Sequence, residues 1–238
     1  MGQNTNCFYD ILKVYDLSNV LNPDSIIDDG FEKYKRPDPL GYIDTNFRRF
    51  QIHFTSFEKS KTNPYEYVIN GKTKVSDNVC SFIGTITIIA AEYDTSDLMK
   101  LIGFPTYRGG SITSQVLIYE DKMHSGSGII KGKLTTDIYI NDNGTICYQA
   151  LMLVADGFCN NQFEGNWTSY KTGEKKKCNW GDFRIPYSKD LDGGTCEFSV
   201  EPKYVNNGWT TYEQAWGHSP DTTIVKFARQ KEMEQWWK

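Results

Sequence analysis

From Phe47 to Val200, apolar and polar residues alternate with a period of two, and short clusters of turn residues interrupt the pattern. Phe50, Ile52 and Phe54 alternate in this way with polar neighbours. The period is that of a β-strand with one buried face. The links between successive segments are too short for parallel pairing, which requires crossover segments of about a dozen residues or more. The region is therefore expected to form consecutive antiparallel strands.

Turn signals divide this region into a series of strand-like segments. The expected strands are 49–55, 65–69, 79–93, 112–123, 129–140, 145–155, 163–170, 178–185 and 196–200. Asn70-Gly71 directly follows the second segment and predicts a hairpin there, because both central residues of a type I′ turn need positive φ. Closure into a barrel would remove the exposed edges of such a meander. We therefore predict a mainly β fold, an antiparallel up-and-down meander that closes into a barrel or a strongly curled sheet.

The two ends of the chain have a different pattern and predict short helices. Phe8, Ile11 and Leu12 have helical spacing, and Ser219-Pro220-Asp221 resembles an N-cap followed by a proline at the first helical position. Alternation at 223–227 leaves a closing strand as the alternative there. The expected single domain comprises a helical or irregular N-terminal segment, a barrel and a helical C-terminal extension, over residues 1–45, 46–200 and 201–238.

Charge and hydropathy exclude several classes of partner. The chain has 26 Lys and Arg against 30 Asp and Glu, a net charge of -4. Nucleic-acid binding needs clustered basic residues, and the densest basic run, 175–177, fits a turn tip. No stretch approaches the roughly twenty apolar residues of a membrane-spanning helix, and the first thirty residues lack a signal-peptide pattern. We expect a soluble, cytoplasmic protein without a nucleic-acid partner or membrane span; export after removal of a signal peptide is the alternative.

No cofactor or metal ion is expected from the cysteines and histidines. His53, His124 and His218 are isolated, and no two cysteines have the spacing of a zinc ribbon or a redox motif. Reduced thiols are the default, with a disulfide in the region 159–196 as the alternative for an exported protein. The six cysteines are Cys7, Cys80, Cys147, Cys159, Cys178 and Cys196.

The densest cluster of polar and aromatic side chains runs from Asp156 to Pro186. If 163–170 and 178–185 pair as a hairpin, Trp167 and Trp180 approach each other across the pair, either as a stabilising contact or as a stacking platform for a planar or sugar ligand. The candidate ligand-binding residues are Asn161, Trp167, Tyr170, Trp180, Asp182 and Arg184.

Charged residues of the same region allow two further interpretations. Asp182 and Arg184 are two positions apart on a predicted strand, so they are expected to share a face and to form an ion pair or to recognise a charged ligand. Asp156 and Glu164 are candidates for the two carboxylates of a glycosidase-type hydrolase.

A short motif near this cluster resembles a known family. Asn161 to Trp167 contains Gly165-x-Trp167, which is similar to the Gly-x-Trp signature of calycins, the lipocalin, fatty-acid-binding and avidin-type barrels. The resemblance covers about a dozen residues and implies a β-barrel in which the Gly lets a strand bend and the Trp closes one end of the core. It departs from the family in position, because calycins carry the motif near the mature N-terminus.

The C-terminal segment ends in Trp236 and Trp237 among charged residues. Two adjacent tryptophans at a terminus expose a large apolar surface, which proteins usually bury on their own body or use against a partner. We expect this segment to dock on one end of the barrel, on a protein partner or on a second copy of the chain.

These features favour a non-enzymatic β-barrel protein that binds a small ligand or a protein partner. One alternative is a hydrolase-type enzyme that uses carboxylates between Asp156 and Arg184. The other is a structural or immunity-type interaction protein with no small-molecule site.

Overall fold

The computed structural model describes residues 8–217 and 220–238, so the expectations for Cys7, His218 and Ser219 lie outside it. The strands are β1 (Ser25–Ile27), β2 (Lys33–Lys35), β3 (Leu40–Ile43), β4 (Arg48–Arg49), β5 (Gln51–Lys59), β6 (Glu66–Val75), β7 (Asn78–Tyr93), β8 (Arg108–Glu120), β9 (Gly128–Ile140), β10 (Ile146–Tyr148), β11 (Asn160–Ser169) and β12 (Lys175–Asp182). The helices are α1 (Phe8–Ile11), α2 (Ser18–Leu21), α3 (Leu98–Leu101), α4 (Thr210–Trp216) and α5 (Thr222–Glu232).

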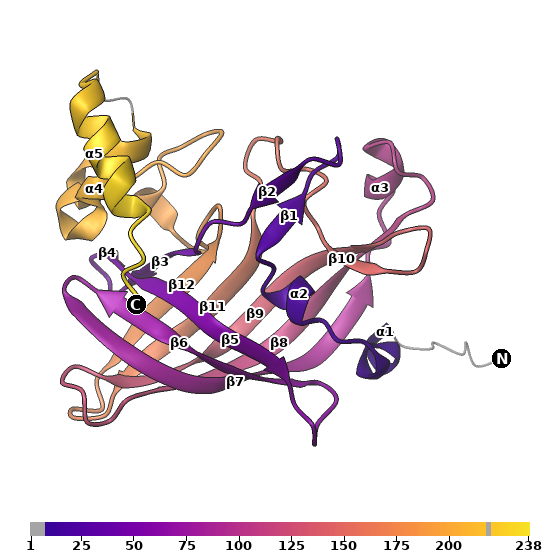
Figure 1. Ribbon diagram of the computed structural model, residues 1–238, viewed down its shortest axis with the longest axis horizontal. Coiled ribbons are helices and arrows are strands. Elements are labelled where there is room, and N and C mark those ends of the chain that lie inside the picture. Colours follow the sequence, from indigo (N-terminus) through magenta and orange to yellow (C-terminus); the bar gives the residue numbers. More distant parts are fainter. Residues whose placement is uncertain (1–7, 218–219) are drawn as a thin grey trace.

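One large antiparallel sheet dominates the molecule (Figure 1). Its strand order is β4-β3-β12-β11-β9-β8-β7-β6-β5, with β10 paired to β9 and with β1 and β2 in a separate ribbon. The sheet curls through 221° into a half-barrel. The prediction of a mainly β, strongly curled antiparallel meander with short terminal helices is therefore confirmed.

The two outermost strands of the sheet, β4 and β5, are consecutive in sequence. Only Phe50 separates them, and its backbone N–H donates to the carbonyl of Gly41 in β3 at 2.9 Å. The chain thus connects both edges of the half-barrel at one corner, which reduces the length of unpaired edge that the sheet exposes.

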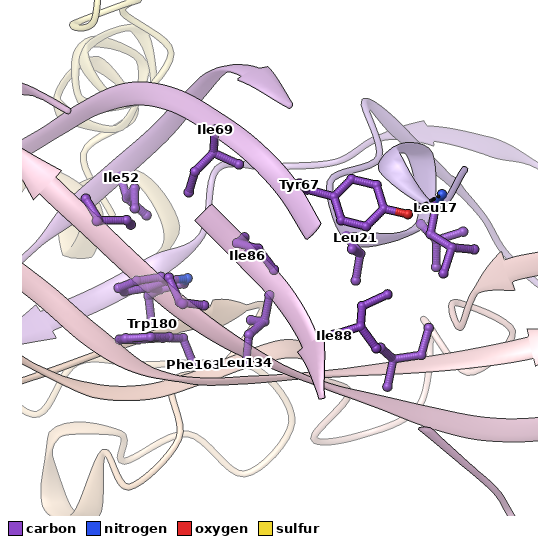
Figure 2. Close-up of a cluster of buried hydrophobic side chains, with 14 of the residues drawn as sticks. Leu17, Leu21, Ile52, Tyr67, Ile69, Ile86, Ile88, Leu134, Phe163 and Trp180 are labelled. Atoms are coloured by element: carbon purple, nitrogen blue, oxygen red, sulfur yellow. Dashed lines mark hydrogen bonds between the residues drawn. The ribbon is translucent and has the colours of Figure 1, made fainter. Parts of the chain in front are cut away.

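The concave side of the sheet is filled by the chain's own side chains (Figure 2). Trp180 stacks on Phe163 with ring centroids 3.5 Å apart. Leu17, directly before α2, and Leu21, the last residue of α2, pack in the same cluster, and the Leu17 N–H donates to the hydroxyl of Tyr67 at 2.9 Å. The space that holds the ligand in a hollow barrel is occupied here by aromatic and aliphatic residues.

The hairpin predicted at Asn70-Gly71 is wrong. Strand β6 runs straight through both residues, and the turn lies further on, between the paired Val75 and Asn78. Gly71 is needed for close packing instead of for a turn, because a Cβ there would lie 2.1 Å from the carbonyl oxygen of His53. A glycine inside a strand often marks such a close approach.

Two other predicted strands are shorter than expected or absent. Of 145–155, only β10 pairs with β9, because the side chain of Asn160 bonds the backbone of Asp137 and Gln149 where the ladder would continue. Segment 196–200 is a loop closed by one bridge between Asp192 and Val200.

The terminal helices form with small changes in their bounds. The N-terminal helical pattern is realised as α1 and α2 with a 3-10 turn, Leu12–Val14, between them. At the other end, the helix predicted from about Pro220 begins at Thr222, because Asp221 caps it and accepts the N–H groups of Thr223 and Ile224. None of the helices in the described ranges combines the length and apolarity needed to cross a membrane.

Candidate functional site

The predicted hairpin of β11 and β12 forms, but its register separates the two tryptophans. Trp167 lies opposite Lys176, whereas Trp180 lies opposite Phe163. The predicted contact between Trp167 and Trp180 is therefore wrong. Trp180 is only 2% exposed and belongs to the core, so it supplies no accessible stacking surface.

Asn161 and Asp182 lie together at the end of the sheet near α2. The carboxylate of Asp182 is fully buried and accepts hydrogen bonds from Arg36 at 2.7 Å and from Tyr148 and Asn161 at 2.9 Å each. Burial raises the pKa of Asp182, while Arg36 and the hydrogen bonds oppose that rise. Because these partners enclose the carboxylate, the cluster acts as an internal structural ion pair.

The predicted pairing of Asp182 with Arg184 is wrong. Strand β12 ends at Asp182, and Phe183 has a φ of +66°, so the alternation on which the prediction depended stops there. Arg184 turns to Asp192 instead, with a nitrogen to oxygen distance of 2.6 Å. The six predicted ligand-binding residues are thus divided among the core, two separate ion pairs and the opposite end of the sheet.

Trp167 lies at that opposite end, beside a buried carboxylate. Its indole N–H donates to Glu120 at 2.8 Å, as does the backbone N–H of Gly128, and the hydroxyl of Thr73 also donates to Glu120. Glu120 is only 5% exposed. Glu120 was not singled out from the sequence. The alternation along β8 places this glutamate at an inward position, and a charged residue there could have indicated a buried carboxylate.

A solvent-open groove of about 680 Å³ lies above this carboxylate, over the outer face of β5 to β8. Its floor includes the buried residues Gly71, Phe82 and Glu120. We call it the outer groove; its other lining residues are Thr55, Asn70, Lys72, Ser81, Ile83, Tyr119, Asp121, Lys122 and Tyr170.

Exposed apolar side chains form one wall of the outer groove. Ile83 and Tyr119 stand opposite each other on β7 and β8 and are 64% and 42% exposed. Both belong to the outward positions of their strands, where polar residues are usual. Of the ligand-binding residues predicted from the sequence, only Tyr170 lines this groove. The other lining residues were not predicted, because four separate strands and the turn after β8 supply them.

Charged groups and one unsatisfied hydroxyl complete the outer groove. The ammonium of Lys122 lies 5.2 Å from the ring centroid of Tyr170. The Tyr170 hydroxyl is buried and has no hydrogen-bond partner within the described ranges. Burial, with smaller contributions from Glu120 and Tyr119, raises the pKa of this hydroxyl, which keeps it a neutral donor.

The C-terminal segment borders the outer groove. Trp237 stacks on His53 with ring centroids 3.6 Å apart, and Lys74 lies 6.0 Å from the ring of Trp236. Glu232 anchors this segment through two hydrogen bonds to Arg49, at 2.7 and 2.6 Å. The predicted candidates Trp236 and Trp237 therefore contact side chains on the sheet of their own chain. The C-terminus lies beside the sheet in Figure 1.

The two carboxylates considered for a hydrolase are both exposed. Asp156 lies on the loop after β10, and Glu164 occupies an outward position of β11. Neither lines the outer groove, so the groove does not bring them together.

Comparisons with known proteins identify no relative: the chain matches no protein-family model, no curated protein and no solved structure.

Proposed function

We propose that this protein is a non-enzymatic binding protein that takes a small ligand in the outer groove. The observation that carries the proposal is the exposed apolar wall of Ile83 and Tyr119 beside the polar and charged side chains of an open groove of about 680 Å³. Ligand sites usually have volumes of roughly 300 to 1,000 Å³ and combine apolar walls with a few polar groups that orient the ligand.

The filled concave side of the sheet supports a ligand on the outer face. Trp180, Phe163 and Tyr67 are among the largest fully buried side chains and lie in one apolar cluster. A ligand there would have to displace close-packed residues, which removes many favourable contacts at once. The outer groove requires no such displacement.

The proposal uses the resemblance to calycins only for the shape of the sheet and not for the position of the ligand. Gly165 has no room for a Cβ, which would lie 2.3 Å from the ring of Phe163, and Trp167 lies near the end of the curled sheet. The position of Trp167 fits the role that the Gly-x-Trp resemblance implies, whereas close packing against Phe163 accounts for the glycine. The ligand position proposed here differs from the interior site of that family.

A thermal-shift panel tests the proposed function. Fatty acids, aromatic carboxylates, nucleotides and small sugars are added to the protein and to a groove variant, Ile83→Ser with Tyr119→Ser. A ligand at a hundred times its Kd stabilises the native state by about 2.7 kcal/mol. We expect at least one class to raise the Tm of the native chain and not that of the variant.

A matched variant separates the groove from general surface effects. Val154→Ser with Met123→Ser also removes exposed apolar side chains, 78% and 92% exposed, from positions that do not line the groove, and it should keep the shift. If no class raises the Tm of the native chain, the proposal is wrong and an interaction protein without a small-molecule site is favoured. A shift that persists in the groove variant also contradicts it.

A further inference from the structure

We propose that the ligand of the outer groove is an amphipathic anion, a molecule with a planar or aliphatic apolar body and one acidic group. This inference rests on the proposed function and specifies its ligand class. It follows from how the charged side chains around the groove are partnered.

Both oxygens of Glu120 and one oxygen of Asp121 accept hydrogen bonds from protein donors. Both oxygens of Glu120 accept hydrogen bonds on the inner side of the sheet, from Thr73 and from Gly128 and Trp167. Asp121 accepts the backbone N–H of Met123 at 2.9 Å in the turn that follows β8. These hydrogen bonds hold the Glu120 carboxylate on the inner side of the sheet and one Asp121 oxygen in the turn, and neither carboxylate forms an ion pair with Lys72 or Lys122 within the described ranges.

The two basic residues of the groove are in the opposite situation. Neither Lys72 nor Lys122 has a carboxylate within 4.0 Å in the parts of the chain that the structure describes. Lys74 projects from the same face of β6 as Lys72, one outward position further along, but it faces the ring of Trp236 and interacts with Glu232, so it is not counted among the groove's lysines. Unpaired ammonium groups beside an apolar wall attract an anion more strongly than they do in bulk water, because the low-dielectric wall reduces screening.

The apolar wall and the unsatisfied hydroxyl define the rest of the ligand. Ile83 and Tyr119 offer an apolar surface that neutral sugars or inorganic ions use poorly, since these ligands lack apolar area to bury. The Tyr170 hydroxyl is a donor without an acceptor, and a buried unsatisfied donor is the kind of group that a ligand oxygen satisfies. The Lys122 ammonium lies 5.2 Å from the centroid of the Tyr170 ring, so an acidic group bound by Lys122 would place its oxygens near Tyr170.

Two fluorescent probes with the same ring system test the inference. 8-Anilinonaphthalene-1-sulfonate carries a sulfonate, and N-phenyl-1-naphthylamine is its neutral counterpart. Each is titrated against the native chain and against Lys72→Gln with Lys122→Gln. We expect the double variant to raise the Kd of the sulfonate probe about tenfold, because two partly screened ion contacts are lost. The Kd of the neutral probe should stay within about twofold of its value for the native chain.

The matched control is Lys131→Gln with Lys133→Gln. These lysines are exposed on β9, outside the groove, and change the net charge by the same amount. The control should leave both Kd values unchanged. Arg108→Gln tests a smaller groove of about 370 Å³ near Tyr93, where Arg108 lies 4.7 Å from the aromatic ring.

Each remaining outcome overturns a defined part of the account. Equal weakening of both probes, or no weakening of the sulfonate, overturns the anion preference and leaves a groove for neutral apolar ligands. A loss of sulfonate binding in Lys131→Gln with Lys133→Gln or in Arg108→Gln overturns the assignment to Lys72 and Lys122. If neither probe binds the native chain, this inference is wrong, and the thermal-shift panel decides separately whether the groove binds a ligand of another class.

Discussion

Trp237 stacks on His53 with a ring separation of 3.6 Å, and His53 stands directly opposite Lys72, which lines the outer groove. The last residues of the chain therefore cover β5, an outermost strand of the sheet, immediately beside the proposed ligand site. Covering an edge strand with another part of the chain is a common protection against unwanted strand pairing. The C-terminal segment thus covers part of this edge beside Lys72, without itself lining the groove.

Removal of residues 233–238 tests whether this segment stabilises its own chain. Trp236 and Trp237 are half-buried, so their loss should lower the free energy of unfolding by about 1 to 2 kcal/mol. The measurement is urea unfolding of dilute protein that size-exclusion chromatography shows to be monomeric. Removal of Lys238 alone is the control and should have no effect. Unchanged monomer stability with loss of a complex would instead assign the tryptophans to a partner or a second copy.

The buried pair of Arg36 and Asp182 predicts a specific pH dependence. Burial raises the native pKa of Asp182 above its ordinary value of 3.8, so the native state keeps its proton at pH values where the unfolded chain has lost it. The contribution of this group to stability is therefore greatest below pH 3.8 and declines as the pH rises through the native pKa. Urea unfolding between about pH 4 and 8 should show this decline in the native chain.

Substitution of each partner checks that assignment. Asp182→Asn removes the titrating group, so its stability should change less over this pH range than that of the native chain. Arg36→Met leaves the carboxylate without its cation and should cost about 3 to 5 kcal/mol near neutral pH. Identical pH profiles for the native chain and Asp182→Asn would contradict the assignment.

Trp167→Phe tests the buried carboxylate beneath the groove. The substitution keeps an aromatic ring but removes the N–H that donates to Glu120 at 2.8 Å. An unmet hydrogen bond to a buried charged group costs about 1 to 3 kcal/mol. Adding Glu120→Gln to Trp167→Phe should recover part of this loss in stability, because the stability effects of substitutions within one hydrogen-bond network do not add. A Trp167→Phe variant as stable as the native chain would mean that this hydrogen bond contributes nothing.

Gly71→Ala tests the position where the predicted hairpin was wrong. A Cβ at Gly71 would lie 2.1 Å from the backbone of His53 and 2.6 Å from the ring of Phe82, so we expect a loss of about 1 to 3 kcal/mol or more. Gly173→Asn is the control: Gly173 has a φ of +70° in the turn between β11 and β12 and nothing within 4 Å of its Cβ position. Asparagine tolerates that conformation, and thermal unfolding should show little change.

The sequence allowed the sheet to be predicted well because strand periodicity is a local property. The alternation at Phe50, Ile52 and Phe54 places Phe50 and Ile52 in the core and Phe54 against it, and the hairpin of β11 and β12 forms as expected. The pairing register of β11 and β12 could not be predicted from the sequence in the same way. The turn between Ser169 and Lys175 fixes which residues face each other, and it places Phe163, not Trp167, opposite Trp180.

The candidate site could be predicted only in part because distant segments assemble it. Asp182 finds its cation in Arg36, far away in sequence, and the positive φ of Phe183 that turns Arg184 aside has no signature in a strand-like run. The outer groove gathers residues from four strands and two turns. In the sequence, only the apolar residues Ile83 and Tyr119 at outward strand positions indicated this groove. They indicate an apolar surface only when β7 and β8 are known to be neighbours.

The most direct test of the central claim is the location of a bound probe. In an NMR titration of isotope-labelled protein with 8-anilinonaphthalene-1-sulfonate, the account predicts that the largest backbone amide shifts occur at Lys72, Tyr119, Lys122 and Tyr170, all of which line the outer groove. Shifts concentrated instead at Leu17, Leu21 and Tyr67, in the apolar cluster on the concave side, would place the ligand inside the half-barrel and would contradict the account.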